Sequence, residues 1–226
     1  MMARCACCCR FRTDLDPGGF DGLILPGGHA PGMRQYLGSP VLSEQVGRFW
    51  RLNRPVGAIC HGVLVLARTR DPATGRSVLA NRRTTCLPKY MERSAYLTTA
   101  WRLGRYYRTY PAYVEDEVRA ALGDPDGQFE RGPVTLSARG TAADDRPAFV
   151  VHDRNYVSAR WPGDAYLFGR TVRDLLESQR SLFRTDRSIR PEHRYLAPLA
   201  RGTPAPHRIP SGRRAAPGAR WHTVSR

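Results

Sequence analysis

The stretch RPVGAICHGVLVLAR, residues 54–68, constrains the fold of this chain more than any other part of its sequence. Residues 56–59 are apolar or small and have the length of a buried strand, whereas the apolar run 63–67 is typical of a buried helix. Only a Cys-His-Gly turn at 60–62 separates the two segments. A strand that passes directly into a helix is the repeating unit of a parallel α/β sheet. The sequence therefore predicts an α/β fold with a cysteine and a histidine at a strand end.

A similar unit precedes this stretch. FDGLILPGG, residues 20–28, has a short apolar strand at 22–25 that a Pro-Gly-Gly turn closes. The apolar residues of segment 41–50 then follow a helical spacing, with Ser39-Pro40 as its N-cap and first-turn proline. The order strand, helix, strand, helix predicts a parallel sheet with right-handed crossovers.

The second half of the chain predicts further elements of both kinds. The expected strands lie near 83–86 and at 133–137, 148–153 and 155–159, the last two joined by a tight turn at Arg154-Asn155, and a helix is expected at 163–179. Residues 89–122 indicate two helices that are split at Pro111 and carry most of the tyrosines. We expect this segment to be an amphipathic pair packed on the sheet, and the alternative is an aromatic cap over a pocket.

The two ends of the chain differ in composition from its middle. We expect a disordered Cys-rich start at 1–19, one domain at 20–186 with a helical insertion at about 89–122, and a disordered Arg/Pro-rich tail at 187–226. The net charge is +16, and nine arginines against a single acid lie in that tail. Lys89 is the only lysine of the sequence, which indicates compositional bias, so we do not expect nucleic-acid binding despite the basic tail. No segment has the apolar length of a membrane span or a signal peptide, and a cytoplasmic protein without membrane partners is expected.

The six cysteines do not form a recognisable framework. Four of them lie in CACCC, at Cys5, Cys7, Cys8 and Cys9, and the other two are Cys60 and Cys86. A zinc site requires a second Cys pair downstream, which is absent from the sequence. We therefore expect neither a metal nor a cofactor.

Cys60 is the candidate nucleophile. In an open parallel sheet, ligands bind at the carboxyl ends of the strands, and a sharp strand-to-helix turn exposes a nucleophile there. Ala58 and Gly62 satisfy the need for small residues on both sides, and the N-terminus of the next helix is expected to lower the pKa of the thiol. The turn at Gly28 ends at the same edge, so its N–H and that of His61 can form an oxyanion hole. The alternative is a buried structural cysteine.

Three motifs carry a family resemblance. LILPGG, AICHG and NYVSARWPGD, taken in this order over residues 20–180, resemble the ThiJ/PfpI family within the class I glutamine amidotransferase-like superfamily. The resemblance implies a flavodoxin-like three-layer sandwich with a mostly parallel sheet, often dimeric or higher. It also assigns roles to individual residues: Cys60 is the nucleophile, His61 its imidazole partner, Gly28 and the His61 amide the oxyanion site, and Arg160 a residue near the pocket. We expect Arg160, together with Tyr90 of the aromatic segment, to bind substrate, and Asp164 to cap the last helix.

The sequence departs from the family pattern before the first motif. Family members begin with a strand and a helix ahead of the L-P-G-G turn, so the resemblance implies that this N-terminal portion, with the acid it often supplies to the cysteine, is missing here. The glutamate that PfpI-type proteases carry after their G-G-x-A-P motif is replaced by Gly32. Glu92 is our first candidate for a substitute acid, and Glu115 is the second.

The resulting expectation is a ThiJ/PfpI-like enzyme that attacks a carbonyl carbon. The candidate reactions are glyoxalase or deglycase chemistry and amidase or peptidase hydrolysis, on a small carbonyl or amide substrate, in a homo-oligomer. A true glutaminase is not expected, because His152-Asp153-Arg154 and Pro191-Glu192-His193 are poorly placed as its His-x-Glu pair. The alternative is a catalytically impaired stress-response or redox-sensing relative in which Cys60 is oxidised without turnover.

Overall fold

The computed structural model describes residues 16–30, 32–108, 110–135 and 137–189, with side chains of the last helix described as far as Ser181. The expected disordered start and tail lie for the most part outside these residues. The expectation of a disordered start is wrong for residues 16–19, where Asp16 caps a 3₁₀ turn, η1 (Pro17–Gly19), by accepting a hydrogen bond from the Gly18 amide.

A single arginine holds residues 16–19 in place. The Arg54 side chain donates to the carbonyl oxygens of Gly18 and Phe20 at 2.8 and 2.5 Å, which ties this segment to the start of the second strand. The other predicted boundary is also displaced, because the last helix continues through residue 186 to Ile189.

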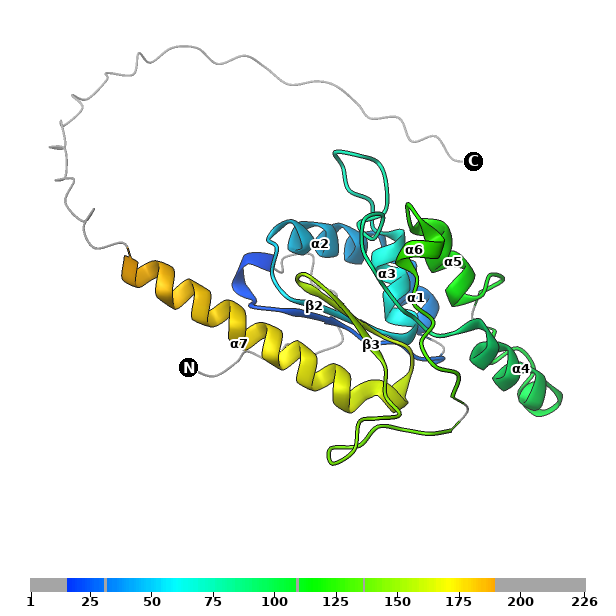
Figure 1. The fold of residues 1–226 in the computed structure, drawn as a ribbon. Helices are drawn as coiled ribbons and strands as arrows, with labels where there is room; N and C mark the ends of the chain where they lie inside the picture. Colours follow the sequence, from blue (N-terminus) through cyan, green and yellow to red (C-terminus); the bar gives the residue numbers. More distant parts are fainter. Residues whose placement is uncertain (1–15, 31, 109, 136, 190–226) are drawn as a thin grey trace, which may run out of the picture. The chain divides into compact units, whose positions relative to one another are not determined.

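Four strands form one sheet (Figure 1). They are β1 (Leu23–Leu25), β2 (Val56–Ile59), β3 (Val150–Asp153) and β4 (Tyr156–Ala159), in the order β1-β2-β4-β3. The strands β1, β2 and β4 are parallel, and β3 is antiparallel to β4 across the expected hairpin. The carboxyl ends of the three parallel strands therefore lie along one edge, as predicted.

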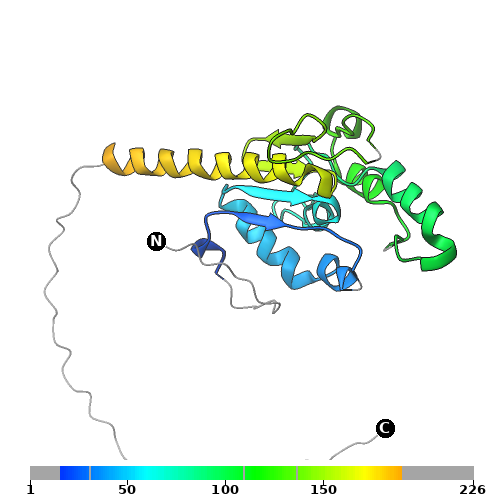
Figure 2. The same cartoon turned by 90° about the horizontal axis from the view of Figure 1, so that it is seen from below.

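Helices cover both faces of this sheet, which confirms the flavodoxin-like three-layer α/β fold (Figure 2). On one face lie α2 (Pro40–Arg51) and α3 (Val63–Arg68), with α1 (Met33–Leu37) before them and α5 (Val114–Ala121) packed on α3. On the other face α7 (Ala165–Ile189) packs on β2 and β4 through Phe168 and Val172. The helix α2 begins as predicted, because the Ser39 hydroxyl accepts from the Leu42 amide at 3.2 Å and Pro40 occupies the first turn.

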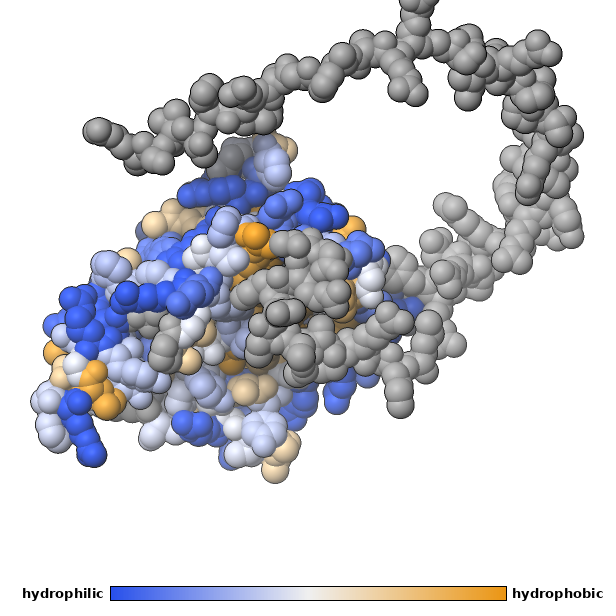
Figure 3. All heavy atoms as spheres, turned by 180° about the vertical axis from the view of Figure 1, so that it is seen from behind, coloured by the Kyte–Doolittle hydropathy of each residue, from blue (hydrophilic) through white to orange (hydrophobic). Residues whose placement is uncertain are grey.

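The segment 89–122 contains the two expected helices, α4 (Lys89–Leu103) and α5, on either side of Pro111. The helix α5 buries Val114 and Val118, as expected of an amphipathic helix, but it packs mainly on α3 and not on the sheet. The expected packing is also wrong for most of α4, which leaves Leu97 and Trp101 62% and 82% exposed. Figure 3 shows orange hydrophobic side chains among the blue ones on the side of the molecule where α4 lies.

Two of the predicted strands are absent from the described chain. Near 83–86 only Thr84 forms a β-bridge, with Phe129, and the Thr85 amide donates to the Ser158 hydroxyl instead of to a strand. Residues 133–135 and 137 also lie outside any strand, and here too side chains bind the backbone in place of a neighbouring strand. The short helix α6 (Pro125–Gln128) lies between these two segments.

Candidate active site

Cys60 lies directly after β2, in the first residue of the 3₁₀ turn η2 (Cys60–Gly62) that leads into α3. Its φ angle is 60°, a left-handed backbone conformation that residues other than glycine rarely adopt. Such local strain is found most often at functional sites, where the surrounding structure enforces it. Only 6% of Cys60 is exposed. The turn thus holds a nucleophilic residue in an unusual conformation at the carboxyl edge of the sheet.

The turn after β1 touches the turn after β2, as the sequence predicted. A Cβ atom at Gly27 would lie 2.6 Å from the amide nitrogen of His61, and one at Gly62 would overlap the carbonyl oxygen of Leu25. Glycine at both positions therefore lets the two turns meet. Gly28, the expected oxyanion residue, follows directly after this contact, and its role in an oxyanion hole stays a prediction.

His61 is the immediate partner of the thiol. Its Nδ1 lies 3.4 Å from the Cys60 Sγ, and its ring is 1% exposed. Burial, with smaller contributions from His29 and Arg68, lowers the pKa of His61 to about 3. Burial raises the pKa of the Cys60 thiol to about 12. The resting site therefore holds a neutral thiol beside a neutral imidazole.

This protonation state corrects one expectation from the sequence. The N-terminus of the following helix was expected to lower the pKa of Cys60 toward neutrality. Burial of the nearly inaccessible thiol raises its pKa instead. A thiolate must then form by proton transfer to His61 during the attack.

His29 is the residue that the sequence analysis missed. Its ring centroid lies 4.5 Å from that of His61 in an edge-to-face contact, and Tyr107 flanks it at 4.8 Å. The His29 Nδ1 and the His61 Nε2 are both buried without a hydrogen-bond partner in the described part of the chain. Unpaired buried polar atoms are rare, and two of them in touching rings indicate a place for a polar atom of a ligand. The position of His29 directly after the Pro-Gly-Gly turn is the sequence signal that could have identified it.

Glu92 is buried in α4, 2% exposed, although most of that helix faces solvent. Its Oε2 accepts a hydrogen bond from the Val114 amide at 3.0 Å. Burial raises the pKa of this carboxyl, and a charge on Glu92 contributes to the raised pKa values of both Cys60 and Cys86. Its role as the acid of the site stays a prediction. Glu115, the second candidate, binds the Lys89 amide and Arg131 instead.

Arg160 is not placed to bind a substrate. It is completely buried, and its guanidinium donates to both oxygens of Asp164 at 2.9 Å and to the carbonyl of Pro133 at 2.7 Å. Asp164 also accepts from the amides of Phe149 and Arg160, so it does not cap α7 as predicted. The pair Arg160–Asp164 is a structural link between the strand β4 and the loop that precedes β3.

The hydroxyl group of Tyr90 is likewise bound to the protein backbone. Its hydroxyl donates to the carbonyl of Thr135 at 3.2 Å and accepts from the amide of the same residue at 3.0 Å. These two bonds hold the segment that was predicted to be a strand. Gly32, the position of the family glutamate, precedes the first turn of α1 and contributes no side chain.

The described residues also bear on metal sites and membrane spans. Among them no group of three or more His, Cys, Asp or Glu side chains is arranged to hold a metal ion. None of the helices in this part of the chain combines the length and apolar character that a membrane span requires.

Comparison with known proteins identifies relatives of the chain. Residues 13–133 match the model of a family described as ThiJ/PfpI family-like. The DJ-1 homolog D of Arabidopsis thaliana is 40% identical over 67 residues, which cover 30% of this chain and 16% of that protein. A deglycase of Pyrococcus abyssi is 27% identical over 164 residues, 73% of this chain and 67% of its own.

A solved structure shows the same fold. Glyoxalase III of Candida albicans superposes with a TM-score of 0.52 and 21% identity, over 73% of this chain and 59% of that one. The chain thus spans less than two thirds of the length of both the Arabidopsis protein and this enzyme. The matched family region covers more than half of the sequence and contains the contact between the Pro-Gly-Gly turn and the Cys-His-Gly turn. The chain therefore belongs to the ThiJ/PfpI family.

Proposed function

We propose that this chain is a cysteine-dependent enzyme of the glyoxalase or deglycase type, with Cys60 as the nucleophile toward an aldehyde carbon. The observation that carries the proposal is the pair of Cys60 Sγ and His61 Nδ1, 3.4 Å apart, at the strand end where Cys60 adopts a left-handed backbone conformation. This arrangement fits a nucleophile elbow. The similarity to a deglycase and to a glyoxalase III supports the same class of reaction.

The first step is the addition of the Cys60 thiol to the aldehyde group of the substrate. The Cys60 sulfur forms a bond to the aldehyde carbon of an α-oxoaldehyde, and the electron pair of the C=O bond moves to oxygen. The thiol proton moves to His61 Nδ1 and then to that oxygen, which leaves a neutral hemithioacetal. The backbone N–H groups of Gly28 and His61 are proposed to stabilise the oxygen while it is charged.

In the second step, two hydrogens move within the adduct. The hydroxyl proton of the hemithioacetal moves to the oxygen of the neighbouring carbonyl, and the proton on the former aldehyde carbon moves to the carbon of that carbonyl, which gives a thioester of a 2-hydroxy acid. Water then hydrolyses the thioester and releases the acid and the Cys60 thiol. His29 and His61, with their unpaired nitrogens in touching rings, are the groups that we propose to bind the reacting oxygens and carry these protons.

The structure favours this enzymatic role over redox sensing. A sensor cysteine is accessible and has a low pKa. Cys60 is 6% exposed, and its pKa is raised by burial. A thiol of this kind reacts when a neighbouring base removes its proton, which is the arrangement that His61 provides.

The wider setting belongs to the proposal as well. We propose a protein of the cytoplasm that acts on a small reactive carbonyl compound in the manner of a stress-response enzyme, and that associates with further copies of itself. Amide substrates are the second choice, because neither relative named above is described as an amidase.

The experiment is turnover of methylglyoxal by the full chain, followed as loss of the dicarbonyl and appearance of lactate. Cys60→Ser is expected to reduce kcat/KM by at least about a thousandfold, because the nucleophile is removed. Cys86→Ser is the matched control, since Cys86 is also buried but lies in the loop before α4. Equal turnover by the two variants would refute the proposal.

A further inference from the structure

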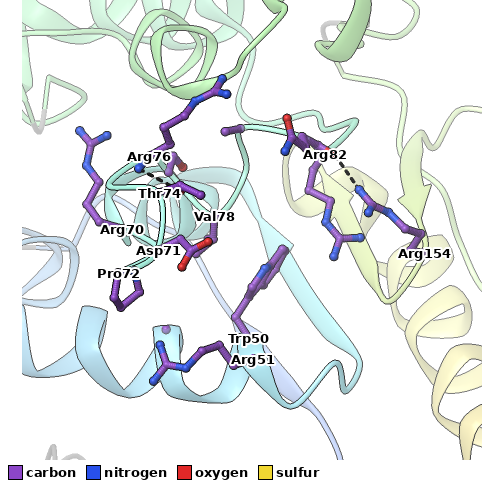
Figure 4. Close-up of a pocket in the computed structure, with 14 residues that line it drawn as sticks. Trp50, Arg51, Arg70, Asp71, Pro72, Thr74, Arg76, Val78, Arg82 and Arg154 are labelled. Carbon is purple, nitrogen blue, oxygen red and sulfur yellow. Dashed lines mark hydrogen bonds between the residues drawn. The ribbon is translucent and has the colours of Figure 1, made fainter.

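A hollow of about 260 Å³ lies at the edge of the sheet opposite to Cys60. Arg154, which lines it, comes directly before β4, whereas Cys60 comes directly after the parallel strand β2. The wall is formed by the last turns of α2, the loop between α3 and α4, and the β3–β4 turn (Figure 4). The lining residues that carry the argument are Trp50, Arg51, Arg70, Asp71, Arg82 and Arg154.

Positive charge is concentrated in this hollow. Arg51, Arg70, Arg76, Arg82 and Arg154 line it together with one acid, Asp71. Elsewhere in the described chain, many arginines are paired with a carboxylate. Within the part of the chain that the structure describes, none of the first four of these arginines has a carboxylate partner within 4.0 Å.

Arg82 is the most unusual of the group. It is 9% exposed, and within the described residues its guanidinium makes one hydrogen bond, to the carbonyl of Asp153 at 3.3 Å. The nearby Asp153 carboxylate is engaged by Arg154 and by the amide of Arg83. The other buried arginine, Arg160, is paired with both oxygens of Asp164. A buried charge without a counterion is costly, so an anion from solution would satisfy Arg82.

An aromatic wall accompanies this charge. The Arg82 guanidinium lies 5.0 Å from the centroid of the Trp50 ring, and Figure 4 shows both side chains on the inner side of the hollow. Arg51 and Arg70 extend from its rim in the same view. These rim side chains are exposed and have long flexible stems, so they can turn toward a bound anion.

We propose that this hollow binds a small organic phosphate, with the phosphoryl group on Arg82 and the arginines of the rim, and an apolar or aromatic portion against Trp50. Guanidinium groups match the geometry of phosphate oxygens with two parallel hydrogen bonds. The volume of about 260 Å³ admits a phosphoryl group together with part of the molecule that carries it. The site is separate from Cys60 and does not depend on the proposed reaction. Burial and the charge of Arg154 lower the pKa of Arg82, which agrees with an unmet demand for negative charge.

The test is calorimetric titration of the full chain with AMP, inorganic phosphate and adenosine at low ionic strength. AMP and phosphate are expected to bind and adenosine is not. Arg82→Met is expected to weaken AMP binding by about 10- to 100-fold, since it removes the charged donor while it retains much of the side-chain volume. If Arg82→Met does not fold, the exposed pair Arg51→Ser/Arg70→Ser provides the same test, with a loss of about tenfold.

The matched control removes the same number of charges elsewhere. Arg93→Ser/Arg102→Ser alters two exposed arginines of α4, and AMP affinity is expected to remain that of the wild type. A tighter interaction with AMP than with phosphate supports a contribution from Trp50, and equal affinities support a site for the phosphoryl group alone. The proposal is overturned if AMP does not bind, if adenosine binds as tightly as AMP, or if the control weakens binding as much as the pocket variants.

Discussion

At the scale of single residues, the chemistry of this chain depends on two groups that are both neutral at rest. The pKa of Cys60 is raised to about 12 and that of His61 is lowered to about 3, in each case chiefly by burial. A thiolate–imidazolium pair is therefore not the ground state. The proton leaves the sulfur only as the bond to the substrate forms, so substrate binding and proton transfer are coupled steps of one attack.

The neutral state of His61 makes the stability of the protein depend on pH. The pKa of His61 in the folded chain is about 3, below the ordinary value of 6.5. At a pH between these two values, His61 is therefore protonated in the unfolded chain and neutral in the folded chain. The free energy of unfolding that this group contributes is complete above pH 6.5 and falls by up to about 1.4 kcal/mol per pH unit below it. His61→Asn is expected to flatten this slope in urea unfolding at pH 7, 6 and 5.

His152→Asn is the control for this experiment. His152 is exposed, and its Nε2 contacts only the carbonyl of Arg154. The variant is expected to retain the wild-type slope. If His61→Asn and the wild type lose stability in parallel on acidification, His61 is not buried in its neutral form.

The sequence was informative about single residues where a motif fixes the backbone. Cys60 and His61 could be located because a strand end, a turn and a helix start fall within a few residues of each other. Arg160 and Tyr90 were predicted to bind substrate, but their polar atoms bind Asp164 and the backbone of Thr135, partners that are set by tertiary packing. His29 was missed because a single histidine beside a glycine turn has no periodic pattern.

At the scale of elements, one buried ion pair holds the loop before β3 against β4. Asp164 binds the Arg160 side chain and two backbone amides while both side chains are fully buried. Asp164→Asn is expected to destabilise the protein by about 3–5 kcal/mol, because it leaves the Arg160 charge buried without a counterion. The measurement is the free energy of unfolding in urea.

An exposed pair in the same loop provides the comparison. Asp144 binds Arg146, whose side chain is 88% exposed. Asp144→Asn is expected to cost at most about 1 kcal/mol, since solvent screens such pairs. Equal losses for the two variants would show that the Arg160–Asp164 pair is not essential to this link.

The helices and strands that were predicted correctly are those whose own residues determine their structure. The strands β1, β2 and β4, the β3–β4 hairpin and the helices α2, α3 and α7 follow from apolar runs, turns and an N-cap. The described residues near 83–86 and at 133–135 and 137 do not form the expected strands, because the Ser158 and Tyr90 hydroxyls and the Arg160 guanidinium bind backbone groups there. Those side chains are distant in sequence, and no local pattern reveals them.

At the scale of the whole molecule, exposed apolar surface on α4 and at the edge of the sheet indicates association. Leu97 and Trp101 are 62% and 82% exposed, and Ile24 of the edge strand β1 is 55% exposed. Such patches often mark contacts between chains. Sedimentation velocity is expected to show a dimer or larger species, and Leu97→Ser/Trp101→Ser is expected to shift it toward the monomer.

Leu52→Ser is the control for this prediction, because Leu52 is 41% exposed but lies at the end of α2 and not on α4. It is expected to leave the sedimentation coefficient unchanged. A wild-type protein that sediments as a monomer at micromolar concentration would contradict the proposed association.

The central claim, that Cys60 is a nucleophile activated by His61, is tested most directly by the rate of its alkylation. The full chain is treated with iodoacetamide at pH 7, and the modification of the Cys60 and Cys86 peptides is followed by mass spectrometry. Both thiols are buried and have raised pKa values, but in the described chain only Cys60 has an imidazole nitrogen within hydrogen-bond reach. We expect Cys60 to react at least about 100-fold faster than Cys86, and His61→Ala to remove most of that difference, the usual contribution of a general base. Equal rates for the two cysteines in the folded wild-type protein would contradict the account.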